Sequence, residues 1–188
     1  MKGKGRLIII ASPSGGGKTS IIKHLLNKYP SMVHSISCTT RPARDGEKDG
    51  RYYHHIDKKA FEGGMKSGKF AEWALVHDNF YGTPKEPLDN WLLAAKDVLL
   101  DLDIVGSLNL KKLYGNRAIT IFLLPPSMEE LKKRLESRKT DSVEARNLRL
   151  KNAIAELSKK DMFDRQVVND VLEQTYREVE KIIGYADS

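Results

Sequence analysis

Residues 12–20, SPSGGGKTS, have the residue types and spacing of a phosphate-binding loop. Three consecutive glycines stand directly before Lys18 and Thr19, after the apolar run LIIIA. Glycines let a loop turn its backbone N–H groups around phosphate oxygens, because no Cβ blocks the turn. A lysine here reaches the outer phosphates, and the next hydroxyl is a Mg²⁺ ligand. The pattern G-x-x-x-x-G-K-[ST], with Ser12 at the first glycine, predicts a site for a nucleoside triphosphate.

Two aspartates follow a second apolar run. Asp101 and Asp103 end the stretch VLLDLD, and a carboxylate at the end of a strand can orient Mg²⁺ or its water ligands. A GTPase would also need the base-reading string N-K-x-D. The nearest string is NKYP, which lacks the aspartate, so the pattern favours a kinase or an ATPase.

A basic segment, SCTTRPARDGEKDGRYY at 37–53, suits a second phosphorylated molecule. Its arginines, Arg41 and Arg44, lie three residues apart, and guanidinium groups bind phosphate through paired hydrogen bonds. The formal net charge is +7; residues 1–56 hold 10 Lys/Arg against 3 Asp/Glu, whereas the rest of the chain holds 22 of each. The alternative is an ordinary basic turn, since PARDG is typical of turns.

The elements that must position these groups alternate between apolar runs and helical periods. Strands are predicted at 6–11, 32–38, 98–103, 118–124 and 166–168, and helices at 18–28, 127–138, 142–160 and 171–185. Near-continuous β-branched runs alternating with helices indicate an α/β fold, with a parallel sheet of about five strands covered on both faces. Ser127 and Glu130 predict a capping box at the start of one helix.

The 188 residues are predicted to form a single domain. Its core is expected at 1–38, 85–136 and 150–188, with a small mixed α/β insertion at about 39–84 and a short charged lid at about 137–149. Apolar runs stay well short of the roughly 18 residues that cross a bilayer. The single cysteine, Cys38, suits a reducing cytoplasm.

Taken together, the motifs resemble the guanylate kinase family. The resemblance rests on SPSGGGKTS, TTRPARDGEKDGRYY, FAEWALVHDNFYGT, DLDIVG, LLPPSMEELKKRLESR and QVVND, and covers roughly residues 5–183. It implies a P-loop core with a GMP-binding insertion and a lid. The implied reaction is ATP + GMP to ADP + GDP with Mg²⁺ as cofactor, in cytoplasmic purine nucleotide metabolism.

The resemblance also implies the site residues. ATP is expected at Pro13, Ser14, Gly15, Gly16, Gly17, Lys18, Thr19, Ser20, Arg134, Asn169 and Asp170. GMP is expected at Arg41, Arg44, Tyr53 and Tyr81 around its phosphate and at Ser37, Glu72, Gly82, Thr83 and Asp103 on the guanine side. The implied catalytic residues are Lys18, Arg44, Arg138 and Arg149, and the implied metal residues are Thr19 and Asp101, partly through water.

Base selectivity follows from the chemistry of Glu72. Guanine presents two neighbouring donors, N1–H and the 2-amino group, and one carboxylate can accept both; adenine presents an acceptor at N1. By composition alone, Glu72 within FAEWAL would be an outward-facing strand residue, and only the resemblance places it in a site. The chain departs from the family pattern at Ser12, His55, Val105, Arg165 and Val171.

Three alternatives stay open at this stage. A kinase of the same fold could act on another acceptor, such as a sugar phosphate or a different nucleotide. A guanylate-kinase-like scaffold could bind peptides without catalysis, although such domains typically have a damaged phosphate loop. Nucleic-acid binding through the basic third lacks a recognisable module. The expected partners are ATP and GMP, with dGMP as a further candidate acceptor, and neither nucleic acid nor membrane; monomer and homo-oligomer are both open.

Overall fold

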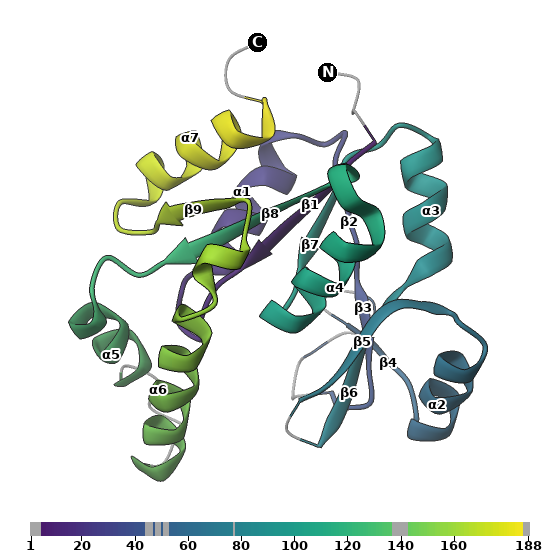
Figure 1. Cartoon of the computed structure of the whole chain (residues 1–188), viewed down its shortest axis with the longest axis horizontal. Helices are drawn as coiled ribbons and strands as arrows, with labels where there is room; N and C mark the ends of the chain where they lie inside the picture. Colours follow the sequence, from purple (N-terminus) through teal and green to yellow (C-terminus); the bar gives the residue numbers. More distant parts are fainter. Residues whose placement is uncertain are drawn as a thin grey trace.

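A five-stranded parallel sheet forms the centre of the computed structural model (Figure 1). The structure describes residues 5–43, 47, 50, 53–76, 78–136 and 143–185, without the side chains of 143–146. The sheet has the order β2-β7-β1-β8-β9, and every pair in it is parallel. Its strands are β1 (Leu7–Ala11), β2 (Val33–His34), β7 (Val98–Asp101), β8 (Ala118–Leu124) and β9 (Arg165–Val168). The predicted α/β fold with about five parallel strands is confirmed.

Helices cover both faces of this sheet. Ile8 and Ile10 of β1 pack toward α1 (Lys18–Lys28) and α7 (Leu172–Ile183). Leu7 and Ile9 point the other way, toward α3 (Lys85–Leu93) and α4 (Ile104–Tyr114). Because successive strand residues face opposite sides, a strand covered on both faces must be apolar throughout. This explains the uninterrupted run LIIIA, which is fully buried.

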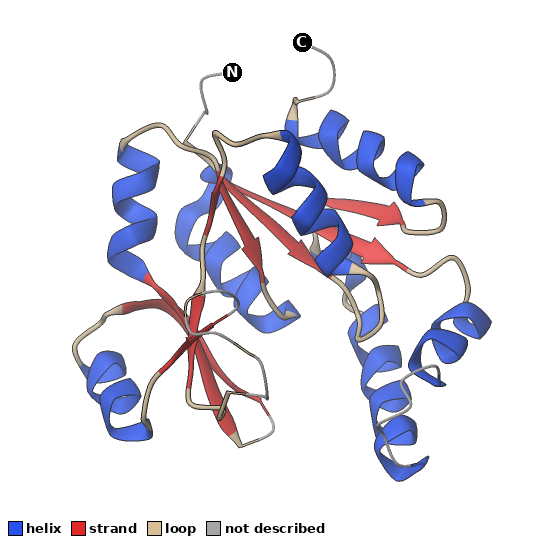
Figure 2. Ribbon diagram, turned by 180° about the vertical axis from the view of Figure 1, so that it is seen from behind, coloured by secondary structure: helices blue, strands red, loops and turns tan. Residues whose placement is uncertain are grey.

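A second, mixed sheet lies beside the first (Figure 2). It has the order β4-β3-β6-β5, with β3 and β4 parallel and the other pairs antiparallel. Its elements are β3 (Ser37–Thr39), β4 (Tyr53–His55), β5 (Phe70–Val76) and β6 (Asn79–Pro84), with α2 (Lys58–Lys66) beside them. This layer begins at Ser37, two residues before the segment at about 39–84 that the sequence set apart from the main sheet, and it ends with that segment at Pro84.

The strand predicted at 32–38 is wrong as a single element. Val33 and His34 pair with β7 in the main sheet, whereas Ser37 to Thr39 pair with β4 and β6 in the second. The backbone of Ser35 makes the last bond to the main sheet, by donating to the carbonyl of Leu99 (3.0 Å). The polar residues between the two short strands mark the place where the chain passes from one sheet to the other.

Two further helices, α5 (Met128–Glu136) and α6 (Val143–Leu157), extend beyond the carboxyl ends of β8 and β1 (Figure 1). The hydroxyl of Ser127 accepts a hydrogen bond from the Glu130 N–H (3.1 Å), as a cap at the start of α5 should. In the predicted lid, residues 137–142 lie outside the described part, and 143–149 form the first half of α6. Short 3₁₀ turns occur at Gly115–Arg117 and Lys160–Met162. Within the described residues, every helix is too short or too polar to cross a bilayer.

Candidate active site

The loop between β1 and α1 has the geometry that its glycines predict. Gly15 and Gly17 adopt left-handed backbone angles, with φ of +85° and +88°, which glycine adopts without a steric cost. The Gly16 N–H donates to the Pro13 carbonyl (2.9 Å). A Cβ on Gly16 would come within 2.5 Å of the Ser12 side chain. All three glycines are therefore needed for this turn.

Asn169, one of the residues expected to bind ATP, contacts this loop. Its side-chain amide donates to the Gly16 carbonyl (2.8 Å), and the residue is 2% exposed. A Cβ on Gly17 would collide with the same amide. Arg134 of α5 donates to the Asn169 carbonyl (3.3 Å). Asn169 and Arg134 thus brace the phosphate loop from the side of β9, while the neighbouring Asp170 is exposed.

Lys18 and Asp101 face each other at the mouth of the loop. The Lys18 ammonium lies 3.6 Å from an Asp101 carboxylate oxygen and donates to the Ser12 carbonyl at 3.5 Å. Thr19, the first hydroxyl of α1, lines the same cavity as Asp101. A carboxylate and a hydroxyl within one cavity form the oxygen donor set that suits Mg²⁺. The residues present therefore fit the metal.

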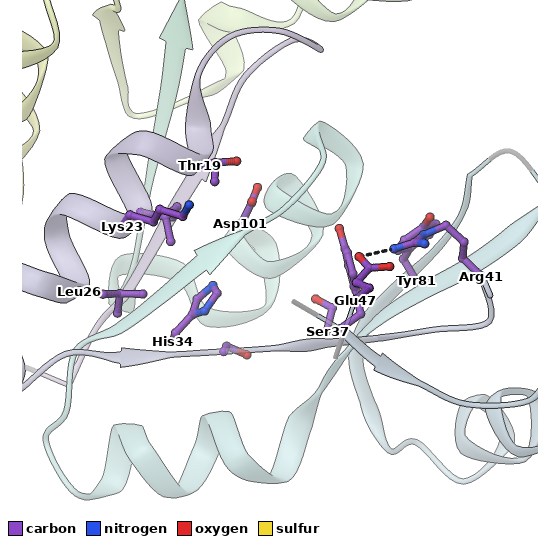
Figure 3. Close-up of a pocket in the computed structure, with 12 residues that line it drawn as sticks. Thr19, Lys23, Leu26, His34, Ser37, Arg41, Glu47, Tyr81 and Asp101 are labelled. Carbon is purple, nitrogen blue, oxygen red and sulfur yellow. Dashed lines mark hydrogen bonds and ion pairs between the residues drawn. The ribbon is translucent and has the colours of Figure 1, made fainter. Parts of the chain in front are cut away.

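A cavity of about 610 Å³ extends from these residues to the second sheet (Figure 3). Asp101 lies between its two ends in this view, with Lys23 and His34 toward one end and Arg41 and Tyr81 toward the other. Burial lowers the pKa of His34. The cavity is lined by Thr19, Ile22, Lys23, Leu26, His34, Ser35, Ser37, Arg41, Glu47, Tyr53, Tyr81 and Asp101.

Arg41, Tyr53 and Tyr81 meet at the second-sheet end of this cavity. The Arg41 guanidinium lies over the Tyr53 ring at 5.5 Å, and the rings of Tyr53 and Tyr81 meet edge to face at 5.6 Å. Burial raises the pKa of Tyr53 to about 12, so its hydroxyl stays a hydrogen-bond donor at neutral pH. These groups suit a phosphate. Arg44, predicted beside them, lies outside the described residues.

Glu47 is a site residue that sequence reasoning missed. Its carboxylate accepts a hydrogen bond from Arg41 (2.9 Å), and both side chains are largely buried. This hydrogen bond is the main cause that raises the pKa of Arg41. The signal was an acidic residue six positions after Arg41, inside the basic segment itself. Glu47 therefore fixes the guanidinium at the wall of the cavity.

Glu72 lines a smaller cavity of about 210 Å³. It is 8% exposed, and its carboxylate accepts a hydrogen bond from the Thr83 hydroxyl (2.5 Å). Burial raises the pKa of Glu72 to about 7; the Thr83 bond opposes this change, and the nearby charge of Asp103 adds to it. The cavity is lined by Lys18, Ser37, Tyr53, Glu72, Ala74, Val76, Tyr81, Asp101, Leu102 and Asp103.

Asp103 and Gly82 support this region in different ways. Asp103 caps α4, since its carboxylate accepts from the Gly106 N–H (2.7 Å), and it lines the cavity that contains Glu72. A Cβ on Gly106 would come within 2.7 Å of Glu72 Oε2, so α4 closes tightly over the carboxylate. Gly82 lines neither cavity; a Cβ there would lie 2.8 Å from the Phe61 ring. Close packing explains this glycine.

The three arginines predicted around the ATP phosphates, Arg134, Arg138 and Arg149, divide between described and undescribed residues. Arg134 also pairs with Glu130 one turn earlier (3.1 Å), which holds it toward Asn169. Arg149 lies half-buried on α6. Arg138 lies outside the described residues.

Because its pKa is raised in the folded protein, Glu72 should make stability depend on pH. Below about pH 4.5 both folded and unfolded states hold the proton. Between about pH 4.5 and 7 the Glu72 carboxyl ionises in the unfolded chain before it does so in the folded protein, so the free energy of unfolding falls as the pH rises. Above about pH 7 the loss of stability stays at about 3 kcal/mol. Urea unfolding across this range should show that the stability of Glu72→Gln increases relative to that of the unsubstituted protein as the pH rises. Parallel stability curves for the two proteins would contradict the placement of Glu72.

Comparisons with known proteins identify the family of the chain. The family model described as guanylate kinase matches residues 4–186. A guanylate kinase of Chlorobium luteolum is 43% identical over 93% of this chain and 89% of its own length. A guanylate kinase from the Wolbachia of Brugia malayi is 39% identical over 97% of this chain and 94% of its own length.

Solved structures give the same result at the level of fold. A guanylate kinase from Anaplasma phagocytophilum matches with a TM-score of 0.79 and 30% identity, over 98% of this chain and 87% of that one. A gluconokinase from Sinorhizobium meliloti shares the fold alone. It matches with a TM-score of 0.52 and 14% identity, over 97% of this chain and 93% of that one. The matching family model and the curated relatives show that the chain belongs to the guanylate kinase family.

Proposed function

We propose that this protein transfers the γ-phosphoryl group of ATP to GMP, which yields ADP and GDP. One observation carries the proposal: the cavity of about 210 Å³ is lined both by Lys18 of the phosphate loop and by the buried carboxylate of Glu72. A group that binds triphosphate and a group that can read guanine thus share one space. Tyr53 and Tyr81 belong to the same lining.

The acceptor is held at its two ends. Glu72 in its ionised form accepts hydrogen bonds from N1–H and the 2-amino group of guanine, and Thr83 holds the carboxylate in place. Ser37 and Asp103 complete the base side. At the other end Arg41, Arg44, Tyr53 and Tyr81 bind the phosphate, with the guanidinium groups making paired bonds. Because the base and the phosphate of GMP are bound by different groups of residues, these contacts together fix the direction in which GMP lies in the site.

The reaction is a direct in-line displacement. A phosphate oxygen of GMP forms a bond to the γ-phosphorus as the bond from that phosphorus to the β,γ-bridging oxygen breaks, and ADP leaves. The attacking oxygen is already anionic, so a strong general base is unnecessary. Lys18 and the lid arginines Arg138 and Arg149 stabilise the charge that develops on the transferred group. Backbone N–H groups between Ser14 and Thr19 hold the remaining phosphates.

Magnesium would be held by Thr19 and Asp101, partly through water ligands. When bound, it would supply positive charge that neutralises the donor phosphates. Lys18, 3.6 Å from Asp101, keeps that carboxylate oriented toward the loop. Purine nucleotide metabolism in the cytoplasm is the proposed setting, supported by the substrate pair and by the single cysteine.

A coupled assay of ADP release tests the function directly. We expect GMP to be phosphorylated with Mg²⁺–ATP at least about 10³-fold more efficiently than AMP, UMP or a sugar phosphate, as kcat/KM. The comparison must use purified protein and matched acceptor concentrations. Preference for any other acceptor would reject guanylate kinase activity while leaving the phosphate loop as a donor site.

Replacing Arg41 with alanine should weaken the acceptor site selectively. Losing a charge-assisted contact to phosphate is expected to raise the KM for GMP about 10- to 100-fold, while the KM for ATP changes little. Steady-state kinetics with each substrate varied in turn measures both. Arg117→Ala is a poor control because Arg117 bonds to two backbone carbonyls; Arg177→Ala, at an exposed position on α7, serves better. Equal losses for both substrates would contradict the assignment.

A further inference from the structure

A carboxylate from α6 accepts a hydrogen bond from one backbone N–H group of the phosphate loop. Oε2 of Glu156 accepts a hydrogen bond from the Ser14 backbone N–H at 3.3 Å. Ser14 belongs to the stretch whose N–H groups are proposed to surround the donor phosphates. Glu156 was absent from every set of site residues expected from the sequence. The contact joins the phosphate loop to the helix that carries Arg149.

Packing around this contact shows that it is built into the fold. Leu131 and Leu135 of α5 form a buried cluster with Ala153 of α6, and Leu157 packs against it. A Cβ on Gly15 would lie 3.4 Å from Leu135, so the loop rests directly on this cluster. Glu156 comes just before Leu157 and three positions after Ala153, which places its side chain beside the apolar contact. The same packing that seats the loop on α5 thus brings the carboxylate of α6 to Ser14.

Charges around Glu156 have opposite effects on it. Lys18 attracts its carboxylate, and Asp103 repels it. Burial raises the pKa of Glu156, and the Ser14 bond is the first of the causes that oppose this change. A triphosphate in the loop would bring further negative charge to the same N–H groups and the same lysine. One N–H cannot satisfy a carboxylate and a phosphate fully, and two anions at this separation repel.

We infer that Glu156 competes with the donor nucleotide for the Ser14 N–H, so that nucleotide binding releases this end of α6. Arg149 lies seven residues, or about two turns, before Glu156, and therefore on the same helix face. Release of Glu156 would free the helix to bring Arg149 toward the phosphates. The inference rests on the proposed function for the identity of the donor, and it does not depend on the acceptor.

Competition of this kind lowers donor affinity, because part of the binding free energy is spent on displacing the carboxylate. Glu156→Gln keeps the size of the side chain and removes its charge. We expect this variant to bind Mg²⁺–ADP about 3- to 10-fold more tightly than the unsubstituted protein. Glu156→Ala should bind at least as tightly as Glu156→Gln. Isothermal titration calorimetry in the absence of GMP measures these affinities.

The matched control is Glu178→Gln, which removes the same charge from an exposed position on α7. It should leave ADP affinity unchanged, which would separate the local effect from the change in net charge. Unchanged or weaker ADP binding in Glu156→Gln, with a normal thermal midpoint, would overturn the inference. Weaker binding together with a lower kcat would mean that Glu156 assists the donor phosphates.

The amide signal of Ser14 in a nitrogen–proton NMR spectrum gives an independent readout. Without nucleotide, the signal should differ between Glu156→Ala and the unsubstituted protein, because the bond to the carboxylate is absent from the variant. With saturating Mg²⁺–ADP the two signals should coincide, since phosphate then replaces the carboxylate. A difference that persists at saturation would show that Glu156 stays on the loop, and the inference would fail.

The two proposals can fail separately. If the purified protein binds ADP but does not phosphorylate GMP, the proposed function fails, and the competition at Ser14 is still decided by the ADP affinities. If GMP is phosphorylated and ADP affinity is insensitive to Glu156, the competition fails and the function stands.

Discussion

Lys18→Ala should lower the rate of GMP phosphorylation by about 10³-fold or more. The ammonium lies at the mouth of the loop, 3.5 Å from the Ser12 carbonyl and 3.6 Å from Asp101. Its charge is expected to act mainly on the transferred group in the transition state, so most of the loss should appear in kcat. Initial rates with saturating ATP and GMP measure the effect.

Lys112→Ala, at an exposed position on α4, is the control for removing one lysine. Both variants should keep their thermal midpoints within a few degrees of the unsubstituted protein, because Lys18 makes few structural contacts. A Lys18→Ala enzyme that is folded and retains activity within about tenfold would contradict the assigned function of this residue.

Glu72→Gln should change which base the enzyme accepts. The carboxylate offers two acceptors to the two donors of guanine, whereas an amide offers one acceptor and one donor. The donor of the amide then faces a donor of guanine but suits the N1 acceptor of adenine. We expect the ratio of kcat/KM for GMP to that for AMP to fall by about 10³-fold, mainly through loss of activity with GMP.

The control substitution is Glu62→Gln on α2, in the same layer of the structure but in the lining of neither cavity. It should leave the ratio unchanged. Equal losses with GMP and AMP after Glu72→Gln would indicate a structural effect of the substitution. An unchanged ratio would mean that another group selects the base.

Local patterns in the sequence predicted the phosphate loop and the main sheet well. The glycines, Lys18 and Thr19 are consecutive, and the buried strands are uninterrupted apolar runs, so each signal lies within a few residues. The helices α3 and α4 were not predicted individually, although both pack on the sheet. Their apolar residues are spread among polar ones, and the pattern of the segment before Lys85 indicated turns and short strands.

Long-range contacts could not be predicted in this way. Asn169 reaches Gly16 across 153 positions, and Glu156 reaches Ser14 across 142. Such contacts depend on how α5, α6 and β9 pack beside the loop, which periodicity does not specify. Glu72 shows the same limit: within its strand it alternates like a surface residue, and its burial follows from α4 closing over it at Gly106.

A crystal structure with GMP and a non-hydrolysable ATP analogue with Mg²⁺ tests the central claim most directly. The account expects guanine against Glu72, the GMP phosphate on Arg41, and one of its oxygens in line with the γ-phosphorus held by the loop at Lys18. A structure with both nucleotides bound but with guanine turned away from Glu72, or with the two phosphates out of line, would contradict it.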